Sequence, residues 1–252
     1  MARPDFTSHR LFIDAPLAAG VAAALDGPQA NYLFNVLRLQ PGAELLAFNG
    51  RDGEWRVRLA RPAKREASLT PLEQLRPQPL PNDLHCLFAP LKHARLDYMV
   101  QKAVEMGVSR LQPALTARTQ ATRVNIERMR ANAIEAAEQC GVLVLPDVGE
   151  AQPLAALLAA METDRALVFC DEDAAQADPV SALRDLGEAR KLAVVIGPEG
   201  GFDPRERALL LARPRTLRLS LGPRILRADT AAVAALALVQ AVLGDWRPML
   251  QK

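Results

Sequence analysis

The chain has 252 residues, of which 50% are apolar and 24% are charged, and its formal net charge at pH 7 is +2. This composition is ordinary for a globular protein with one large domain or two small ones. It excludes a disordered chain, a collagen-like repeat and a strongly basic, histone-like protein.

Cysteine and histidine are too sparse for a disulfide framework or a metal centre. Cys86, Cys140 and Cys170 form no CxxC pair, and the three histidines form no HExxH motif. We therefore predict no metal site and a reducing compartment. The N-terminus lacks the apolar region of a signal peptide, and no apolar stretch is long enough to cross a bilayer. We accordingly expect a cytoplasmic protein that has no membrane partner.

A proline-rich connector divides the chain near residue 80. The segment Arg76–Asn82 contains three prolines, which fix the backbone and remove hydrogen-bond donors, so we predict that it is extended. Before it, the residue patterns predict a helix at Pro28–Leu39 and strands at Leu45–Phe48 and Glu54–Leu59. Short strands in a region of about 75 residues favour a small β-barrel.

The region before the connector has ten basic and eight acidic residues. The basic side chains gather in its second half, at Arg51, Arg56, Arg58, Arg61, Lys64 and Arg65. Such a run is typical either of a solvated strand face or of a surface that faces RNA, and the sequence leaves both open.

After the connector, strand patterns alternate with helix patterns. Strands are predicted at Leu84–Pro90, Arg110–Leu115, Ala166–Cys170, Leu192–Ile196 and Leu217–Leu221. Helices are predicted at Arg95–Met106, Asn125–Gln139, Pro179–Leu186, Asp203–Leu211 and Asp229–Leu243. This alternation predicts an α/β fold with a parallel sheet and helices on both of its faces.

Two loops that follow predicted strands have the composition of a ligand site. In open α/β sheets, ligands bind beyond the carboxyl ends of the strands. The loop at 196–202 reads IGPEGGF, and its glycines allow a ligand to approach the backbone closely. The loop at 221–230 reads LGPRILRADT and holds two arginines and an acid. The alternatives are a tight strand-to-helix turn for the first loop and a local Arg227–Asp229 ion pair in the second.

Three common nucleotide-binding and catalytic motifs are missing from the sequence. There is no GxxxxGK[ST], no GxGxxG after an early strand and no GxSxG. The chain therefore does not read as a Walker-type NTPase, a dinucleotide-binding enzyme or an α/β-hydrolase.

Six segments in a fixed order carry a resemblance to a known family. They are Val36–Leu39, Phe48–Gly50, Lys102–Val108 together with the preceding Leu91-Lys92, Glu138–Gly141, Val195–Phe202 and Leu219–Arg227. The combination of GPEGG with LGxRILR is a specific signal, and its spacing holds over nearly the whole chain. The sequence resembles the SPOUT methyltransferases of the RsmE type, which methylate N3 of a uridine in the 16S RNA of the small ribosomal subunit.

The resemblance implies two domains. Residues 1–78 would form a PUA-like RNA-binding β-barrel, and residues 79–252 a SPOUT α/β domain with a deep trefoil knot. S-adenosylmethionine would bind in the knot loops, and the active form would be a homodimer with the site at the interface. The strongly apolar last helix fits such an interface, and burial within its own domain is the alternative.

The resemblance also implies roles for individual residues. The cofactor would be held by Gly197, Glu199, Gly201, Leu221, Gly222, Ile225 and Leu226. RNA would be contacted through phosphate binding and stacking by Arg10, Arg38 and Arg118.

Catalysis must deal with the proton that uracil N3 carries at neutral pH. Either a base removes this proton or a cation stabilises the uracil anion. The available cations are Arg224 and Arg227. The available carboxylates are Glu199 and Asp229, the latter standing where the family commonly has glutamate. The ordinary pKa of a carboxyl is low for a base, so we favour charge stabilisation by arginine.

Two other functions remain open from the sequence. One is a noncatalytic RNA-binding ribosome-assembly factor that retains the fold, and binding of S-adenosylmethionine would distinguish it from an enzyme. The other is a SPOUT enzyme that acts on transfer RNA or on a ribose hydroxyl, since residues alone do not choose the nucleotide.

Overall fold

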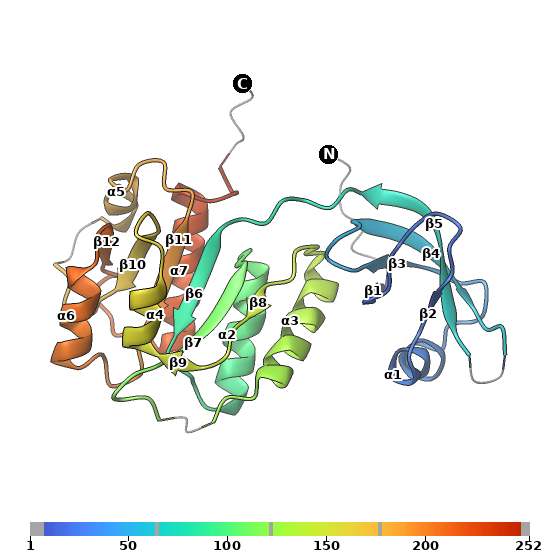
Figure 1. The fold of residues 1–252 in the computed structure, drawn as a ribbon, viewed down its shortest axis with the longest axis horizontal. Coiled ribbons are helices and arrows are strands. Elements are labelled where there is room, and N and C mark those ends of the chain that lie inside the picture. The colour runs from blue at the N-terminus through green and yellow to red at the C-terminus, as the bar shows by residue number, and fades with distance from the viewer. Residues whose placement is uncertain (1–7, 64–65, 121–122, 176–177, 248–252) are drawn as a thin grey trace. The chain divides into compact units, whose positions relative to one another are not determined.

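The computed structural model describes residues 8–63, 66–120, 123–175 and 178–247, except for the side chain of His93. The chain forms two compact units (Figure 1). Unit 1 comprises Met1–Leu80 and Ala137–Leu145, and unit 2 comprises Pro81–Ala136 and Pro146–Lys252.

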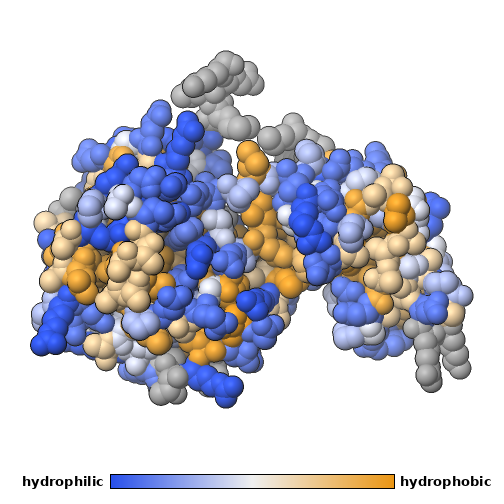
Figure 2. Space-filling model, viewed as in Figure 1, coloured by the Kyte–Doolittle hydropathy of each residue, from blue (hydrophilic) through white to orange (hydrophobic). Residues whose placement is uncertain are grey.

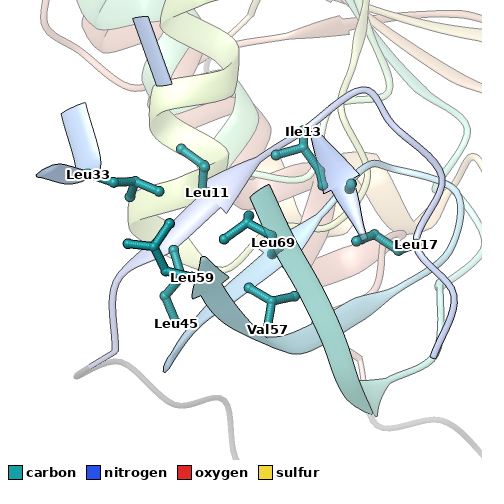
Figure 3. Close-up of a cluster of buried hydrophobic side chains, with 10 residues drawn as sticks. Leu11, Ile13, Leu17, Leu33, Leu45, Val57, Leu59 and Leu69 are labelled. Carbon is teal, nitrogen blue, oxygen red and sulfur yellow. The ribbon is translucent and has the colours of Figure 1, made fainter. Parts of the chain in front are cut away.

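Unit 1 is built on a five-stranded sheet with the order β1-β3-β4-β5-β2. Its strands are β1 (Arg10–Phe12), β2 (Ala23–Ala24), β3 (Glu44–Phe48), β4 (Glu54–Ala60) and β5 (Ser68–Arg76). Strand β1 pairs in parallel with β3, and the other pairs are antiparallel. The predicted alternation in β4 places Val57 and Leu59 on the inner face, where they pack with Leu45 and Leu69 in the core (Figure 3).

The helical segment of unit 1 is shorter than the predicted helix Pro28–Leu39. The α-helix α1 covers Gly27–Asn31, with Asp26 as its capping residue, and a π-helical turn, η1, follows at Tyr32–Val36. Arg38 then adopts a φ of 56°, in the left-handed region that few side chains enter. That conformation prevents a further helical turn, which explains why the helix ends before Leu39.

A buried ion-pair cluster centres on Glu54. Its two carboxylate oxygens accept hydrogen bonds from Arg10 Nε at 2.6 Å and from Arg76 Nε at 2.7 Å. The side chains of Arg10 and Glu54 are only 3% and 2% exposed. Arg10 and Arg76 also donate to the backbone oxygens of Glu138 and Gly141, each at 3.0 Å. The cluster therefore joins the sheet of unit 1 to the second segment of the same unit.

Unit 2 contains a parallel sheet with the order β12-β10-β11-β6-β7-β8, and β9 pairs with β7. Its strands are β6 (Leu84–Phe88), β7 (Arg110–Leu115), β8 (Asp147–Val148), β9 (Gln152–Pro153), β10 (Ala166–Cys170), β11 (Leu192–Ile196) and β12 (Thr216–Leu219). Every residue of β11 is buried, as expected for a central strand with both faces covered.

Helices cover both faces of this sheet (Figure 1). They are α2 (His93–Glu105), α3 (Ile126–Cys140), α4 (Leu154–Ala160), α5 (Pro179–Arg184), α6 (Pro204–Ala212) and α7 (Ala228–Val242). Leu158 of α4 and Leu210 of α6 pack with Leu167 and Val195 of the sheet. Helix α7 packs on β11 and contacts α2 and α5. The predicted α/β architecture is confirmed.

The sequence patterns do not predict the two- and three-residue strands β1, β2, β8 and β9, nor two longer elements, strand β5 and helix α4. Strand β5 contains Pro71 opposite Val57, and its pairing with β4 has register shifts, so its alternation is broken. Helix α4 reads LAALLAA and has no polar face whose period would indicate a helix. In the described part of the chain, no helix is long and apolar enough to span a membrane.

We predict that Glu54→Gln lowers the free energy of unfolding by about 3–5 kcal/mol at neutral pH, because two guanidinium groups lose their buried counter-charge. Burial raises the pKa of Glu54, and the hydrogen bonds from Arg76 and Arg10 more than offset it, so its pKa lies below the ordinary value. The carboxylate therefore stabilises the fold above the unfolded pKa, and this stabilisation is lost as pH falls through the folded pKa.

Urea unfolding of the wild type and the variant at a series of pH values checks this prediction. The difference between them should shrink below about pH 4.3, the ordinary pKa of glutamate. A difference that is the same at neutral and acidic pH would contradict it.

Candidate functional site

The carboxyl ends of β10, β11 and β12 open onto a pocket of about 380 Å³. These strands are parallel neighbours, so the loops that follow them lie at one edge of the sheet. The lining comes mainly from residues 169–173, 196–202 and 219–228. Pockets of about 300–1,000 Å³ are typical of sites for small molecules and cofactors.

All seven residues predicted to hold the cofactor line this pocket: Gly197, Glu199, Gly201, Leu221, Gly222, Ile225 and Leu226. Gly222 has a φ of 96°, and a Cβ added there would meet no described atom within 4 Å. A Cβ on Gly197 would lie 2.7 Å from the ring of Phe202, so this position has no room for a side chain. In both loops, glycines therefore leave main-chain groups uncovered at the pocket. Such an arrangement suits a ligand that is held by main-chain hydrogen bonds.

Arg224 and Arg227 also line the pocket, and both are exposed. Arg227 is the residue before α7 and makes no side-chain capping hydrogen bond. Within the described residues, neither guanidinium group has a hydrogen bond or an ion pair. Both cations are therefore available to an anionic ligand.

Sequence reasoning missed Arg95, which lies in the first turn of α2. Its Nε and Nη2 donate to the carboxylate of Asp229 at 3.1 and 2.7 Å, and its Nη1 donates to Glu199. The alternative that Asp229 pairs with Arg227 is therefore wrong. The hydrogen bonds from Arg95 hold the pKa of Asp229 below its ordinary value, which makes this carboxylate a weak proton acceptor.

A second carboxylate, Asp171 at the end of β10, supports the opposite wall of the pocket. It accepts hydrogen bonds from Arg207 Nη2 at 2.8 Å and from Arg218 Nε at 2.6 Å. Burial raises the pKa of Asp171, and the two arginines outweigh that effect and lower it. Arg207 belongs to α6 and Arg218 to β12, so the carboxylate joins three elements around the pocket.

A smaller cavity of about 120 Å³ adjoins the first pocket, and both are lined by Pro198 and Glu199. Its other lining residues are Pro90, Leu91, Lys92, Arg95, Arg118 and Gln120. Arg118, one of the predicted RNA contacts, donates through Nη1 to the backbone oxygen of Gly200. The structure thus brings Arg118 next to the loop that follows β11.

The other two predicted RNA contacts lie in unit 1 and differ in exposure. Arg38 is exposed. Arg10 is buried against Glu54, so its guanidinium does not face solvent, and this position does not favour a role in RNA binding. Its burial follows from the buried pattern of β1, which the sequence analysis did not identify as a strand.

The basic run of unit 1 is largely paired with acidic neighbours. Arg51, Arg56 and Arg58 form ion pairs with Asp14, Glu73 and Glu44, respectively. Arg61 lies over the ring of Phe34 at 4.8 Å, and Lys64 and Arg65 lie outside the described residues. These contacts favour the solvated strand face over an RNA-facing surface for this run.

Comparison with known proteins identifies the family. Residues 78–240 match the model of an RNA methyltransferase domain, and residues 25–72 match that of an RNA methyltransferase PUA domain. The chain belongs to this RNA methyltransferase family. The resemblance read from the GPEGG and LGxRILR segments is confirmed, as is the PUA-like fold predicted for the front part of the chain.

Relatives match over most of this chain. The chain is 30% identical to ribosomal RNA small subunit methyltransferase E of Rickettsia conorii, over 92% of this chain and 95% of the relative. The protein of the same name from Bacillus subtilis is 26% identical, over 86% and 88%.

Two solved structures have the same fold over nearly their whole length. Ribosomal RNA small subunit methyltransferase E of Neisseria gonorrhoeae, bound to S-adenosylmethionine, is 25% identical, with a TM-score of 0.85 over 95% of this chain and 100% of that chain. A methyltransferase from Legionella pneumophila, also in complex with S-adenosylmethionine, is 27% identical, with a TM-score of 0.83 over 94% and 99%.

We predict that Arg95→Ala lowers the free energy of unfolding by about 1–3 kcal/mol, because Asp229 loses a bidentate partner in a partly buried site. The matched control is Arg128→Ala, which removes a bidentate pair with Asp97 from a side chain that is 61% exposed. That exposed pair should cost less than about 1 kcal/mol. Urea unfolding measures the loss of unfolding free energy in each variant. Equal losses in the two variants would contradict the prediction that the partly buried pair contributes more than the exposed one.

Proposed function

We propose that this protein transfers a methyl group from S-adenosylmethionine to N3 of a uridine in the 16S RNA of the small ribosomal subunit. The observation that carries the proposal is the convergence of the seven predicted cofactor residues on one pocket, in a chain of the RNA methyltransferase family. It is supported by two structural relatives that were solved with S-adenosylmethionine.

The residues of the pocket fit this cofactor. We infer that the backbone of Leu221, Gly222, Ile225 and Leu226 holds its adenosine and methionine parts, and that Gly197, Gly201 and Glu199 complete the site. The left-handed φ of Gly222 and the open space beside it favour such close contact. When bound, S-adenosylmethionine supplies a methyl group on a positively charged sulfur, which leaves as a neutral thioether.

In the reaction, a bond forms between N3 and the methyl carbon as the bond between that carbon and sulfur breaks. The N3 proton leaves to solvent, so negative charge develops on the uracil ring before or during attack. Arg227 and Arg224 line the pocket and are unpaired within the described residues, so we assign to them the stabilisation of this charge. The ion pair with Arg95 makes Asp229 a poor base, and we assign it the role of holding Arg95.

We assign residues 1–78 to a domain that also binds the RNA. Residues 79–252 form the methyltransferase domain, which contains the trefoil knot that the family resemblance implies. Within the first domain we retain Arg38 as an RNA contact, since it is exposed. Arg118 is assigned to RNA near the methyltransferase site.

We further propose that the protein acts in the cytoplasm as a homodimer. Leu209 and Leu211 of α6 are 46% and 42% exposed, and Ile225 is 93% exposed. Figure 2 shows hydrophobic surface over α6. A contiguous exposed apolar patch is typical of a surface that another chain covers.

The substrate is tested by mass mapping of small-subunit RNA from cells that lack this protein. The proposal expects the loss of one methylated uridine, which returns when the gene is restored. An unchanged RNA would contradict the assignment of the substrate.

We predict that Gly222→Val weakens the binding of S-adenosylmethionine at least about 10-fold, because a branched side chain strains the left-handed backbone and fills the space of the ligand. Calorimetric titration measures the affinity. Gly20→Val is the matched control, since Gly20 also has a positive φ, 74°, with no described atom near its added Cβ, but lies in unit 1. Equal affinities of wild type and Gly222→Val would show that this loop does not hold the cofactor.

We predict that Arg227→Ala lowers the methylation rate by about 10²–10³-fold while the affinity for S-adenosylmethionine changes little, because the cation acts on charge that develops in the transition state. Single-turnover methylation of small-subunit RNA at saturating cofactor measures the rate. A rate within a few-fold of the wild type, in a folded and cofactor-bound variant, would remove Arg227 from catalysis.

We predict that Arg38→Ala weakens RNA binding and reduces the slope of log affinity against log salt by about 0.7–0.9, the value for one lost phosphate contact. Binding of S-adenosylmethionine should be unchanged, because Arg38 lies in unit 1. Fluorescence titration of labelled RNA over a range of salt concentrations checks the slope. An unaltered slope would show that Arg38 makes no phosphate contact.

A further inference from the structure

The smaller cavity beside the cofactor pocket, lined by Pro90, Leu91, Lys92, Arg95, Arg118, Gln120, Pro198 and Glu199, has two kinds of wall. Pro90, Leu91 and Pro198 provide apolar surface. The remaining residues provide polar groups, of which Lys92, Arg95, Arg118 and Gln120 are hydrogen-bond donors and Glu199 is an acceptor. A phosphate group would need donors alone, whereas a flat base needs apolar walls for its faces and polar groups for its edge.

The three cations of this cavity differ in the number of anionic or carbonyl partners that each already contacts. Arg95 is held by two carboxylates, those of Glu199 and Asp229. Arg118 donates to one backbone oxygen, that of Gly200. Lys92 is exposed and immediately precedes α2, where its side chain makes no capping hydrogen bond. Its side chain also has no other hydrogen bond or ion pair within the described residues. Lys92 and Arg118 therefore keep positive charge available for a ligand.

The polar groups match one pyrimidine edge. The Watson–Crick edge of uracil presents an acceptor, the N3–H donor and a second acceptor. The donors Lys92, Arg118 and Gln120 suit the two carbonyl oxygens of this edge, and the Glu199 carboxylate suits N3–H. Cytosine presents an acceptor at N3, which a carboxylate would repel. Pro198 and Glu199 line both this cavity and the cofactor pocket, so a base in the cavity would lie next to the cofactor site.

From this juxtaposition we propose that the smaller cavity receives the target uracil, and that Lys92 and Arg118 stabilise the anion that forms when its N3 proton leaves. This inference rests on the proposed function and names the place of the substrate within the same site. The N3 proton leaves to water, as in the proposed reaction. The cations make this transfer easier because they stabilise the anion that it leaves behind.

The test is single-turnover methylation by Lys92→Ala and Arg118→Ala of two RNAs, one with uridine and one with 5-fluorouridine at the target position. We expect each variant to lose at least about 10-fold in rate on the uridine RNA, since one charge-stabilising donor is worth about 10²–10³. The loss should shrink on 5-fluorouridine, because its electron-withdrawing fluorine already stabilises the N3 anion. Calorimetry should show that the affinity for S-adenosylmethionine is unchanged.

Lys191→Ala is the matched control for the lysine, because Lys191 is paired with Asp164 and lines neither pocket. Unchanged rates in both variants would overturn the proposal. An equal loss of rate on the two RNAs, together with weaker RNA binding, would also overturn the proposal, because that result would show that the cations contact a phosphate. If the wild type itself binds no S-adenosylmethionine, the proposed function fails, and that outcome is distinct from a failure of the variants.

Discussion

The parallel pairing of β10 with both β11 and β12 is the constraint on which the site depends. It turns the carboxyl ends of three strands toward the same edge of the sheet, although they are separated in sequence by helices α5 and α6. The loops at 196–202 and 219–228 can line one pocket only because their strands flank β10. Burial of apolar side chains on both faces of the sheet maintains this order, since a slip of one strand would expose them.

Two ion-pair centres then shape the pocket from opposite sides. The buried Asp171 holds α6 and β12 at the end of β10, through Arg207 and Arg218. Arg95 connects α2 to the first turn of α7 and to the loop that follows β11, through Asp229 and Glu199. Because Arg95 neutralises two carboxylates beside the site, it also reduces their repulsion of an anionic RNA. The exposed Arg224 and Arg227 remain available for the reaction itself.

The parts of the structure that local patterns determine could be predicted from the sequence. The apolar strand Leu192–Ile196 and the glycine loop after it were recognisable because burial and positive φ leave local signals. Arg95 gave no such signal, since its partner Asp229 lies 134 residues away and only the fold brings them together. The burial of Arg10 leaves no local signal for a related reason: its strand has three residues, too few to show a period, and only the sheet brings Glu54 next to it.

We assign methyl transfer to a uracil nitrogen to the pocket at the ends of β10, β11 and β12. The most direct test is incubation of the purified protein with small-subunit RNA and S-adenosylmethionine that carries a ¹³C-labelled methyl group. The RNA is then digested to nucleosides, and the labelled product is identified by mass spectrometry and NMR. We expect a single labelled nucleoside, with the methyl group on N3 of uridine. A label on a ribose oxygen, on carbon 5 or on another base, or the absence of label, would contradict it.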